Sequence, residues 1–360
     1  MHSMRCYLVV LAYIAVFFYM SGVKCLMLAH NADFDAIIQT GANGYMAYLG
    51  NRGDEMEMRH IRLSFDLGRT RFVCYSPRDR ESIKDVIADA DVVVNMVGKY
   101  YESGQPVQTE KFPYVGWQTN YSYHDANVKI PQALAEICKE MQVDHFIHVS
   151  SASAAPDAKS EWSRTKYEGE QAVKEIYPWA TIIRPTQLFG KQDRFLNWFA
   201  RMAQWYRMVP LVDGGKKLTQ PVWVADVAKT ILRVCDDPTK YEGKRIDCFG
   251  PNDYTYMELA KFVNDITERD MRMFNLPHYY YSKLAQVLQN TRDPLVIPDL
   301  VELWSEDFLP QMTAEEYKAQ TEILTMENMG IKATPLEKEA FDWLHFYRVG
   351  GHFFRVSGYH

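Results

Sequence analysis

The sequence contains only six cysteines among 360 residues, and no two of them form a CxxC pair. This scarcity excludes a disulfide-stapled miniprotein, which needs closely spaced cysteine pairs to compensate for a small core. Most cysteines beyond Cys25 have apolar neighbours, so we interpret them as free, buried thiols in a reducing compartment. His145 and His148 lie three apart in a strand-like run and point to opposite faces, which excludes a metal ion shared between them.

Positive charge is not in excess either, because 40 Lys and Arg face 46 Asp and Glu, for a net charge of −6. No run of Lys or Arg marks a nucleic-acid surface or a polybasic membrane tether. Repeats and low-complexity stretches are absent too, and the 47% apolar content is that of a globular protein, which excludes collagen and a wholly disordered chain. Aromatic residues are plentiful: 23 Tyr, 18 Phe and 8 Trp, which we expect in a core or at a protein interface.

The first 30 residues contain the one long apolar run of the chain, from Tyr7 to Met20. This run is shorter than the roughly 20 residues that a membrane-spanning helix needs. Arg5 before it and Ser21-Gly22 after it are typical of a secretory signal, and the segment is unlike an Arg-rich and Ser-rich mitochondrial presequence. Three interpretations stay open for residues 1–30: a signal or anchor, a buried strand or helix, and an anomalous N-terminus.

Residues 31–235 alternate between short apolar runs and helical periodicity, which predicts one domain with a Rossmann-like, doubly wound parallel α/β sheet. Strands are expected at 35–38, 71–75, 91–97, 145–149 and 180–183, and helices at 82–90, 130–141 and 165–176. Beyond residue 235 the alternation fades and prolines become frequent. Residues 236–360 therefore predict a smaller, helix-rich C-terminal lobe, with helices at 256–267 and 336–347.

The carboxyl ends of the predicted strands carry residues suited to a dinucleotide, because ligands of a parallel sheet bind beyond those ends. Gly41 and Gly44 predict a tight turn before a helix whose N-terminus can hold a pyrophosphate. The other strand ends, and the helix that follows one of them, add further candidates for cofactor binding: Asn95, Gly98, Ser150, Lys166, Arg184 and Pro185.

Taken in order, these motifs resemble the short-chain dehydrogenase/reductase superfamily, in its extended and atypical branches, from about residue 35 to 250. That resemblance implies a Tyr-x-x-x-Lys motif, in which the tyrosine is the acid/base and the lysine bonds the nicotinamide ribose. Lys166 matches the lysine, but the position four earlier is Trp162, and an indole has no usable acid/base pKa. Tyr167 faces about 100° away from Lys166 on a helix. The sequence therefore predicts a pseudo-enzyme with no catalytic residue.

Further strings are similar to one subfamily, an accessory subunit of mitochondrial respiratory complex I, NADH:ubiquinone oxidoreductase. They lie at 51–55, 78–83, 94–102, 184–190, 220–228 and 330–337. The resemblance implies a non-catalytic subunit at the matrix side of the inner membrane, beside other complex I subunits near the quinone site, with peripheral membrane contact. It also implies a structural NADPH, whose 2′-phosphate would meet the arginine after the second strand, here Arg52. A guanidinium can grip a phosphate bidentately.

The chain departs from that subfamily near its start. Only eleven positions separate Gly41 from Arg52, and a helix of about ten residues plus a strand of about five do not fit there. The first βαβ unit is therefore expected to be truncated. Ser76 and Pro77 stand where an acidic residue beside the adenine is expected.

Two other functions stay open. The first is an active NAD(P)-dependent short-chain reductase or epimerase, which Ser150, Ser151 and Lys166 favour and Trp162 opposes. The second is a secretory or anchored reductase-like protein, which rests on the apolar run alone. The aromatic residues of the C-terminal lobe could form its core or dock on partner subunits or a membrane surface. They include Tyr279, Tyr280, Tyr281, Trp343, Phe346, Tyr347, Phe353 and Phe354.

Overall fold

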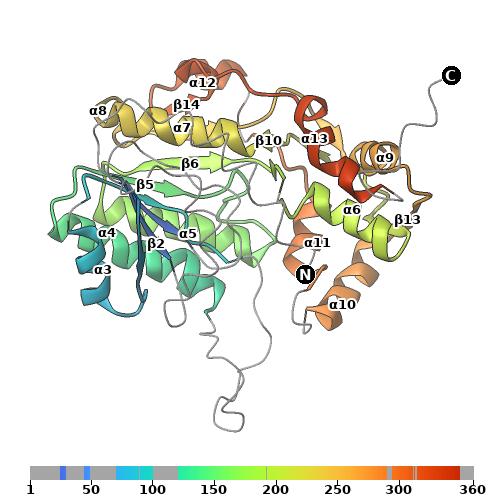
Figure 1. The fold of residues 1–360 in the computed structure, drawn as a ribbon, viewed down its shortest axis with the longest axis horizontal. Coiled ribbons are helices and arrows are strands. Elements are labelled where there is room, and N and C mark those ends of the chain that lie inside the picture. The colour runs from blue at the N-terminus through green and yellow to red at the C-terminus, as the bar shows by residue number, and fades with distance from the viewer. Residues whose placement is uncertain are drawn as a thin grey trace, which may run out of the picture.

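An eight-stranded parallel sheet lies at the centre of the computed structural model, in the order β3-β2-β1-β4-β5-β6-β11-β14 (Figure 1). The structure describes residues 25–29, 44–48, 70–88, 90–99, 121–191, 193–289, 294–310, 312 and 314–348. The strands are β1 (Cys25–Ala29), β2 (Gly44–Tyr48), β3 (Thr70–Cys74), β4 (Val92–Asn95), β5 (His145–Val149), β6 (Thr181–Pro185), β11 (Arg245–Cys248) and β14 (Ile323–Thr325). The order 3-2-1-4-5-6 is that of doubly wound dinucleotide folds, which confirms the predicted fold class.

Helices cover both faces of this sheet (Figure 1). One layer holds α3 (Arg80–Ile87), α4 (Ile130–Glu140) and α5 (Glu161–Ile176), and the other holds α7 (Val224–Asp236), α8 (Pro238–Tyr241) and α12 (Ala314–Ala319). Strand β4 shows why the layers form. Val92 and Val94 pack into the cluster that contains α7, whereas Val93 and Val97 pack into the cluster of α3 and α4. A strand buried on both faces needs such an apolar run.

The remaining helices gather at one end of the sheet as the C-terminal lobe (Figure 1). They are α6 (Leu196–Trp205), α9 (Tyr256–Thr267), α10 (His278–Leu288), α11 (Pro298–Ser305) and α13 (Leu336–Leu344). Their core is aromatic: the ring of Trp304 lies 4.6 Å from that of Trp198, 5.8 Å from Tyr256 and 6.0 Å from Phe199. Offset and edge-on rings at these distances stabilise a core beyond the area they bury.

Short elements complete the lobe and its borders. The strand pairs are β8 (Met208–Val212) with β13 (Arg272–Leu276), β7 (Leu188–Phe189) with β10 (Val222–Trp223), and β9 (Leu218–Thr219) with β12 (Tyr254–Thr255). The short helical turns are η1 (Asp125–Lys129), η2 (Glu327–Met329) and η3 (His345–Tyr347). Two strands that follow residue 235, β11 and β14, belong to the main sheet, so the chain crosses between sheet and lobe more often than its sequence indicates.

The N-terminal strands differ from the prediction. Strand β1 lies within the first 30 residues, and Gly44 is the first residue of β2. The turn predicted at Gly41 to Gly44 is therefore wrong for Gly44, because a residue paired in the middle of a sheet cannot open a helix. Gly41, Arg52, the strand expected at 35–38 and the run from Tyr7 to Met20 lie outside the described residues. Three parallel strands, β1, β2 and β3, precede β4 in the chain.

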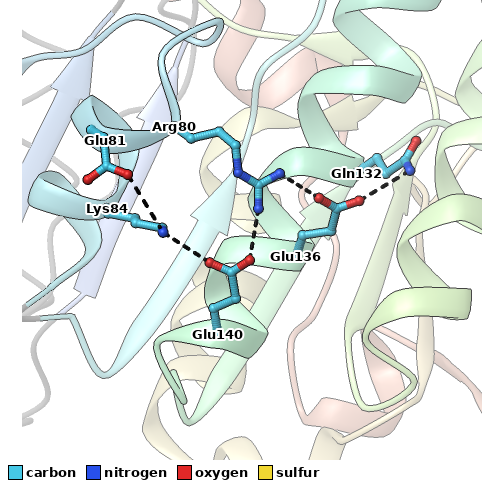
Figure 2. Close-up of polar contacts among 6 residues, drawn as sticks. All are labelled: Arg80, Glu81, Lys84, Gln132, Glu136 and Glu140. Atoms are coloured by element: carbon cyan, nitrogen blue, oxygen red, sulfur yellow. Dashed lines mark hydrogen bonds and ion pairs between the residues drawn. The ribbon is translucent and has the colours of Figure 1, made fainter.

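Polar contacts bind α3 to α4 at the surface (Figure 2). The guanidinium of Arg80 donates to Glu136 at 2.7 Å and to Glu140 at 2.9 Å, and Lys84 lies 3.3 Å from Glu140. Because α3 packs beside β4, these bonds hold α4 against the same side of the sheet as α5.

Three further observations concern the part of the chain that the structure describes. Cys138, Cys235 and Cys248 are buried and free. No helix there is both long enough and apolar enough to cross a bilayer. No three His, Cys, Asp or Glu side chains there gather as a metal site would require.

Candidate functional site

Lys166 is the centre of the candidate site. It lies on the second turn of α5, its side chain is 6% exposed, and it faces the loop that follows β4. A Cβ atom added to Gly98 in that loop would stand 3.2 Å from Lys166 Nζ, so the glycine makes room for the amine. Among the described residues Nζ has no hydrogen-bond partner, although the Trp162 ring centroid lies 5.9 Å away. A buried ammonium without a partner is costly, so the site is suited to a polar ligand.

Burial also changes the acidity of this amine. Desolvation lowers the pKa of Lys166 to about 8, and the negative charge of Glu170, one turn further along α5, partly opposes the shift. The amine is therefore closer to losing its proton at neutral pH than an exposed lysine would be. Such a group can donate a hydrogen bond to a ligand hydroxyl and can take or give a proton there.

Asn127 Oδ1 lies near the same glycine as the Lys166 amine, and Asn127 is not among the residues that the sequence predicts for the site. It belongs to the π-helical turn η1, which continues into α4, and π-helical turns often occur at functional sites. Its Nδ2 donates to Thr165 Oγ1 at 3.0 Å, whereas its Oδ1 is buried without a partner, 3.9 Å from the Cβ position of Gly98. In the sequence Asn127 stands between Ala126 and Val128 with Asp125 and Lys129 close by, and this polar surrounding gives no signal that it lies at a site.

Asn95 shapes the loop that carries Gly98. Its Oδ1 accepts a bond from the Val97 backbone N–H at 3.0 Å, and its Nδ2 lies 3.1 Å from His148 Nδ1. Since the amide can only donate, the imidazole accepts at Nδ1 and its proton is assigned to Nε2. Burial and the charge of Lys166 lower the pKa of His148 to about 3, which keeps the ring neutral. Its Nε2 is buried without a partner.

Trp162 covers the other side of Lys166. The side chain is half-buried, and its Nε1 donates to the backbone carbonyl of Lys99 at 3.0 Å. The indole N–H is therefore committed to the loop after β4. Ser150, at the end of β5, has a buried hydroxyl without a partner, and Ser151 bonds Ser153 rather than Lys166.

Arg184 and Pro185, which the sequence predicts to hold a cofactor, both make contacts within the protein. The Arg184 guanidinium bonds Glu170 bidentately, with Nε 2.8 Å from Oε1 and Nη2 2.6 Å from Oε2, and both side chains are almost fully buried. The buried guanidinium and carboxylate therefore compensate each other's charge within the protein. The Pro185 carbonyl accepts the Ala152 N–H at 2.9 Å and so joins β6 to the loop after β5.

The described half of the site thus presents a cationic amine, an amide oxygen and a serine hydroxyl, all buried, at the carboxyl ends of β4 and β5. Lys166 Nζ and Asn127 Oδ1 both lie within 4 Å of the position that a Cβ atom on Gly98 would take, at 3.2 Å and 3.9 Å. Alternating donors and acceptors around a glycine fit a ribose hydroxyl pair. Arg52 follows the last residue of β2 by four positions in the sequence and lies outside the described residues.

Comparisons with known proteins show the family of the chain. Residues 37–273 match the family described as RmlD substrate binding domain. The mitochondrial NADH dehydrogenase [ubiquinone] 1 alpha subcomplex subunit 9 of Mus musculus is 33% identical over 86% of this chain and 76% of its own length. Its namesake in Arabidopsis thaliana is 31% identical over 83% of this chain and 71% of its own length.

Solved structures share the fold at low sequence identity. A nucleoside-diphosphate-sugar epimerase from Staphylococcus aureus superposes with a TM-score of 0.59 at 11% identity, over 89% of this chain and 99% of its own. The UDP-glucose 4-epimerase of Thermotoga maritima gives 0.59 at 14% identity, over 89% and 98%. These sugar-nucleotide enzymes show a common backbone arrangement and nothing about this chain's chemistry.

Proposed function

This chain belongs to the family of the mitochondrial NADH dehydrogenase [ubiquinone] 1 alpha subcomplex subunit 9, within the RmlD-like reductases, and from that premise we propose that it is a non-catalytic accessory subunit of respiratory complex I. Relatives from mouse, rat, a plant, a fungus and Dictyostelium discoideum share 26–33% identity with it over most of its length. The alternative, an active reductase or epimerase, has weaker support from partial matches such as a dTDP-4-keto-6-deoxy-D-glucose reductase over 28% of the chain.

One observation carries the non-catalytic part of the proposal. Hydride transfer to a carbonyl needs a proton donor positioned beside the reacting oxygen. Trp162 stands four positions before Lys166, where the resemblance described above expects that donor. An indole N–H cannot act as the acid that a phenol can, and this N–H donates to the Lys99 carbonyl. Lys166 remains to bind a ligand, but it lacks the group whose pKa it would adjust.

The nucleotide in this proposal is NADPH, held as a structural element. Lys166 and Asn127 would bind the nicotinamide ribose hydroxyls, and Arg52 would bind the 2′-phosphate. Charge-assisted bonds of about 1.5–3 kcal/mol favour NADPH over NADH by roughly tenfold to a hundredfold. Asp54 and Glu55 follow Arg52 closely and would favour NADH if one of them took its place. The bound nucleotide supplies a hydride in catalytic relatives of the fold, whereas here it would stabilise the folded state.

The proposed partners are other complex I subunits near the quinone site, on the matrix side of the inner membrane, with peripheral contact to its surface. The support on the protein itself is a set of large apolar side chains that stay exposed on the C-terminal lobe. They include Trp205 at 60%, Tyr279 at 65%, Tyr280 at 65% and Val287 at 70% exposure. Exposed apolar groups gathered on one part of a protein mark a binding surface.

Two experiments test the proposal. Tagged full-length protein expressed in mitochondria should co-migrate with complex I on native gels, and recovery only as a free monomer or only in secretory membranes would refute the subunit assignment. Purified protein should show no oxidation of NADH or NADPH with carbonyl substrates. Turnover that disappears in Lys166→Ala would establish the reductase instead.

A binding titration tests the proposed preference for NADPH over NADH. Wild type should bind NADPH more tightly than NADH, and Arg52→Ala should abolish the difference. Arg233→Ala, a change at an exposed arginine of α7, serves as the matched control. Equal affinities in the wild type would remove Arg52 from the site.

A further inference from the structure

Trp162 joins three parts of the molecule that are far apart in sequence. Its indole N–H donates to Lys99 in the loop after β4, and its backbone N–H donates to Asp299 Oδ1, at the start of α11 in the lobe, at 3.4 Å. Its carbonyl accepts a bond from Thr165 Oγ1 at 3.0 Å, and Thr165 in turn bonds Asn127. The residue thus connects the lobe, the first turn of α5 and the β4 loop.

Asp299 is the main tie between the lobe and α5. Its Oδ1 accepts bonds from Ser160 Oγ at 2.9 Å and from the Glu161 backbone N–H at 3.0 Å, in addition to Trp162. Ser160, the N-cap residue of α5, makes no capping bond of its own. A carboxylate from another helix therefore satisfies the free N–H groups of α5 and complements the positive end of the helix dipole.

The Trp162 ring is held over the amine of Lys166 by these bonds. The ring centroid lies 5.9 Å from Nζ, and the loop fixed by the indole N–H places Gly98 against the same amine. Lys166 is 6% exposed, although Glu161 and Arg164 in the preceding turn of the same helix are exposed.

We propose that Trp162 and Asp299 form a latch that closes the approach to Lys166 and so excludes a carbonyl substrate from the site. Trp162 is then a specificity-determining residue. Its ring lies over the Lys166 amine, and its N–H holds the loop after β4 in place beside that amine. That a carbonyl substrate is kept away from a bound nucleotide rests on the function proposed above. That the Lys166 amine is shielded by Trp162 does not depend on any nucleotide.

The test is the accessibility of Lys166 to a small acylating reagent. Full-length protein without nucleotide is treated with the N-hydroxysuccinimide ester of acetic acid, and peptide mass spectrometry gives the acetylation rate of Lys166 relative to exposed Lys139 on α4. In Trp162→Phe, which keeps an aromatic ring and loses the N–H, the ratio should rise about fivefold, the factor that one hydrogen bond corresponds to. Trp162→Ala should raise it further.

Matched variants separate the latch from general loosening. Asp299→Ala should raise the ratio as Trp162→Phe does, whereas Asp299→Asn keeps an acceptor oxygen and should stay within about twofold of wild type. Tyr167→Phe, on the same helix, should leave the ratio unchanged. A wild-type ratio in both Trp162 variants overturns the proposal, and so does equal behaviour of Asp299→Ala and Asp299→Asn.

NADPH then separates this proposal from the preceding one. Added NADPH should slow acetylation of Lys166 and not of Lys139 if the nucleotide binds as proposed. If NADPH has no effect while Trp162→Phe still exposes Lys166, the nucleotide assignment fails and the latch stands.

Discussion

A Cβ atom added to Gly169 would stand 1.9 Å from the backbone carbonyl oxygen of Asn127, so α5 and the π-helical turn η1 meet backbone against backbone. Gly169→Ala should therefore force the two apart and displace Asn127 from Lys166. We expect a loss of about 1–3 kcal/mol in the free energy of unfolding, although alanine favours an isolated helix by about 1 kcal/mol. Urea denaturation measures the change, and an unchanged or higher midpoint would contradict the close contact.

Gly98→Ala is the substitution to compare with Gly169→Ala, because Gly98 lies beside the Lys166 amine where the nucleotide is proposed to bind. The added Cβ would meet the mobile end of the Lys166 side chain at 3.2 Å rather than a backbone atom. Stability should change by less than about 0.5 kcal/mol, whereas NADPH binding should weaken because the amine moves. Calorimetric titration beside urea denaturation checks both halves, and unaltered affinity would place the nucleotide elsewhere.

The buried pair of Arg184 and Glu170 predicts a strong asymmetry between single and double substitutions. Glu170→Gln removes the carboxylate charge that pairs with the buried guanidinium and should cost about 3–5 kcal/mol. The double variant Arg184→Met, Glu170→Leu removes both charges from the dry interior and should lose much less. A double-mutant cycle by urea denaturation gives the coupling, and additive losses would show that the pair is not in contact in solution.

Arg80 should contribute little to stability, and its contribution should depend on salt. Arg80 forms ion pairs with Glu136 and Glu140, but all three side chains are more than a third exposed to solvent. Arg80→Ala should cost at most about 1 kcal/mol at low ionic strength, and roughly 1 M salt should abolish most of the difference. A loss that persists at high salt would indicate that the aliphatic part of Arg80 packs against α4.

The lowered pKa of Lys166 predicts a specific dependence of stability on pH. Between its folded value of about 8 and its ordinary value near 10.4, the unfolded chain binds more protons than the folded protein. The free energy of unfolding should therefore rise with pH across that window, and below it the full cost of burying the charge remains. Lys166→Met should lack this rise. Parallel curves for the two proteins between pH 7 and 10 would show that the amine is not desolvated.

The sequence predicts elements best where apolar residues repeat regularly. The bounds expected for β5 and α9 coincide with those in the structure, because both carry long, consistent patterns. Strand β11 was missed, since its four residues include Arg245 and Asp247, which pair with each other and disguise the apolar pattern. The predicted turn is wrong at Gly44, because a glycine is compatible with a strand as well as with a turn.

The candidate site was predictable only in part, for a related reason. Lys166 and Gly98 follow from local motifs at strand and helix ends. Asn127 and Asp299 act through contacts with residues 38 and 139 positions away, which no local pattern contains. Arg184 pairs with Glu170, 14 positions earlier, and the motif around Arg184 gives no sign of this buried ion pair.

The position of β14 at the edge of the main sheet bears on how the protein is made. Residues 323–325 pair with β11, which pairs with β6, so a ribosome has synthesised nine-tenths of the chain before this edge can be covered. Until then β11 presents a row of free backbone groups to any other strand. The nascent chain therefore needs protection from aggregation until it is almost complete, and it cannot release a finished nucleotide fold early and add the lobe afterwards.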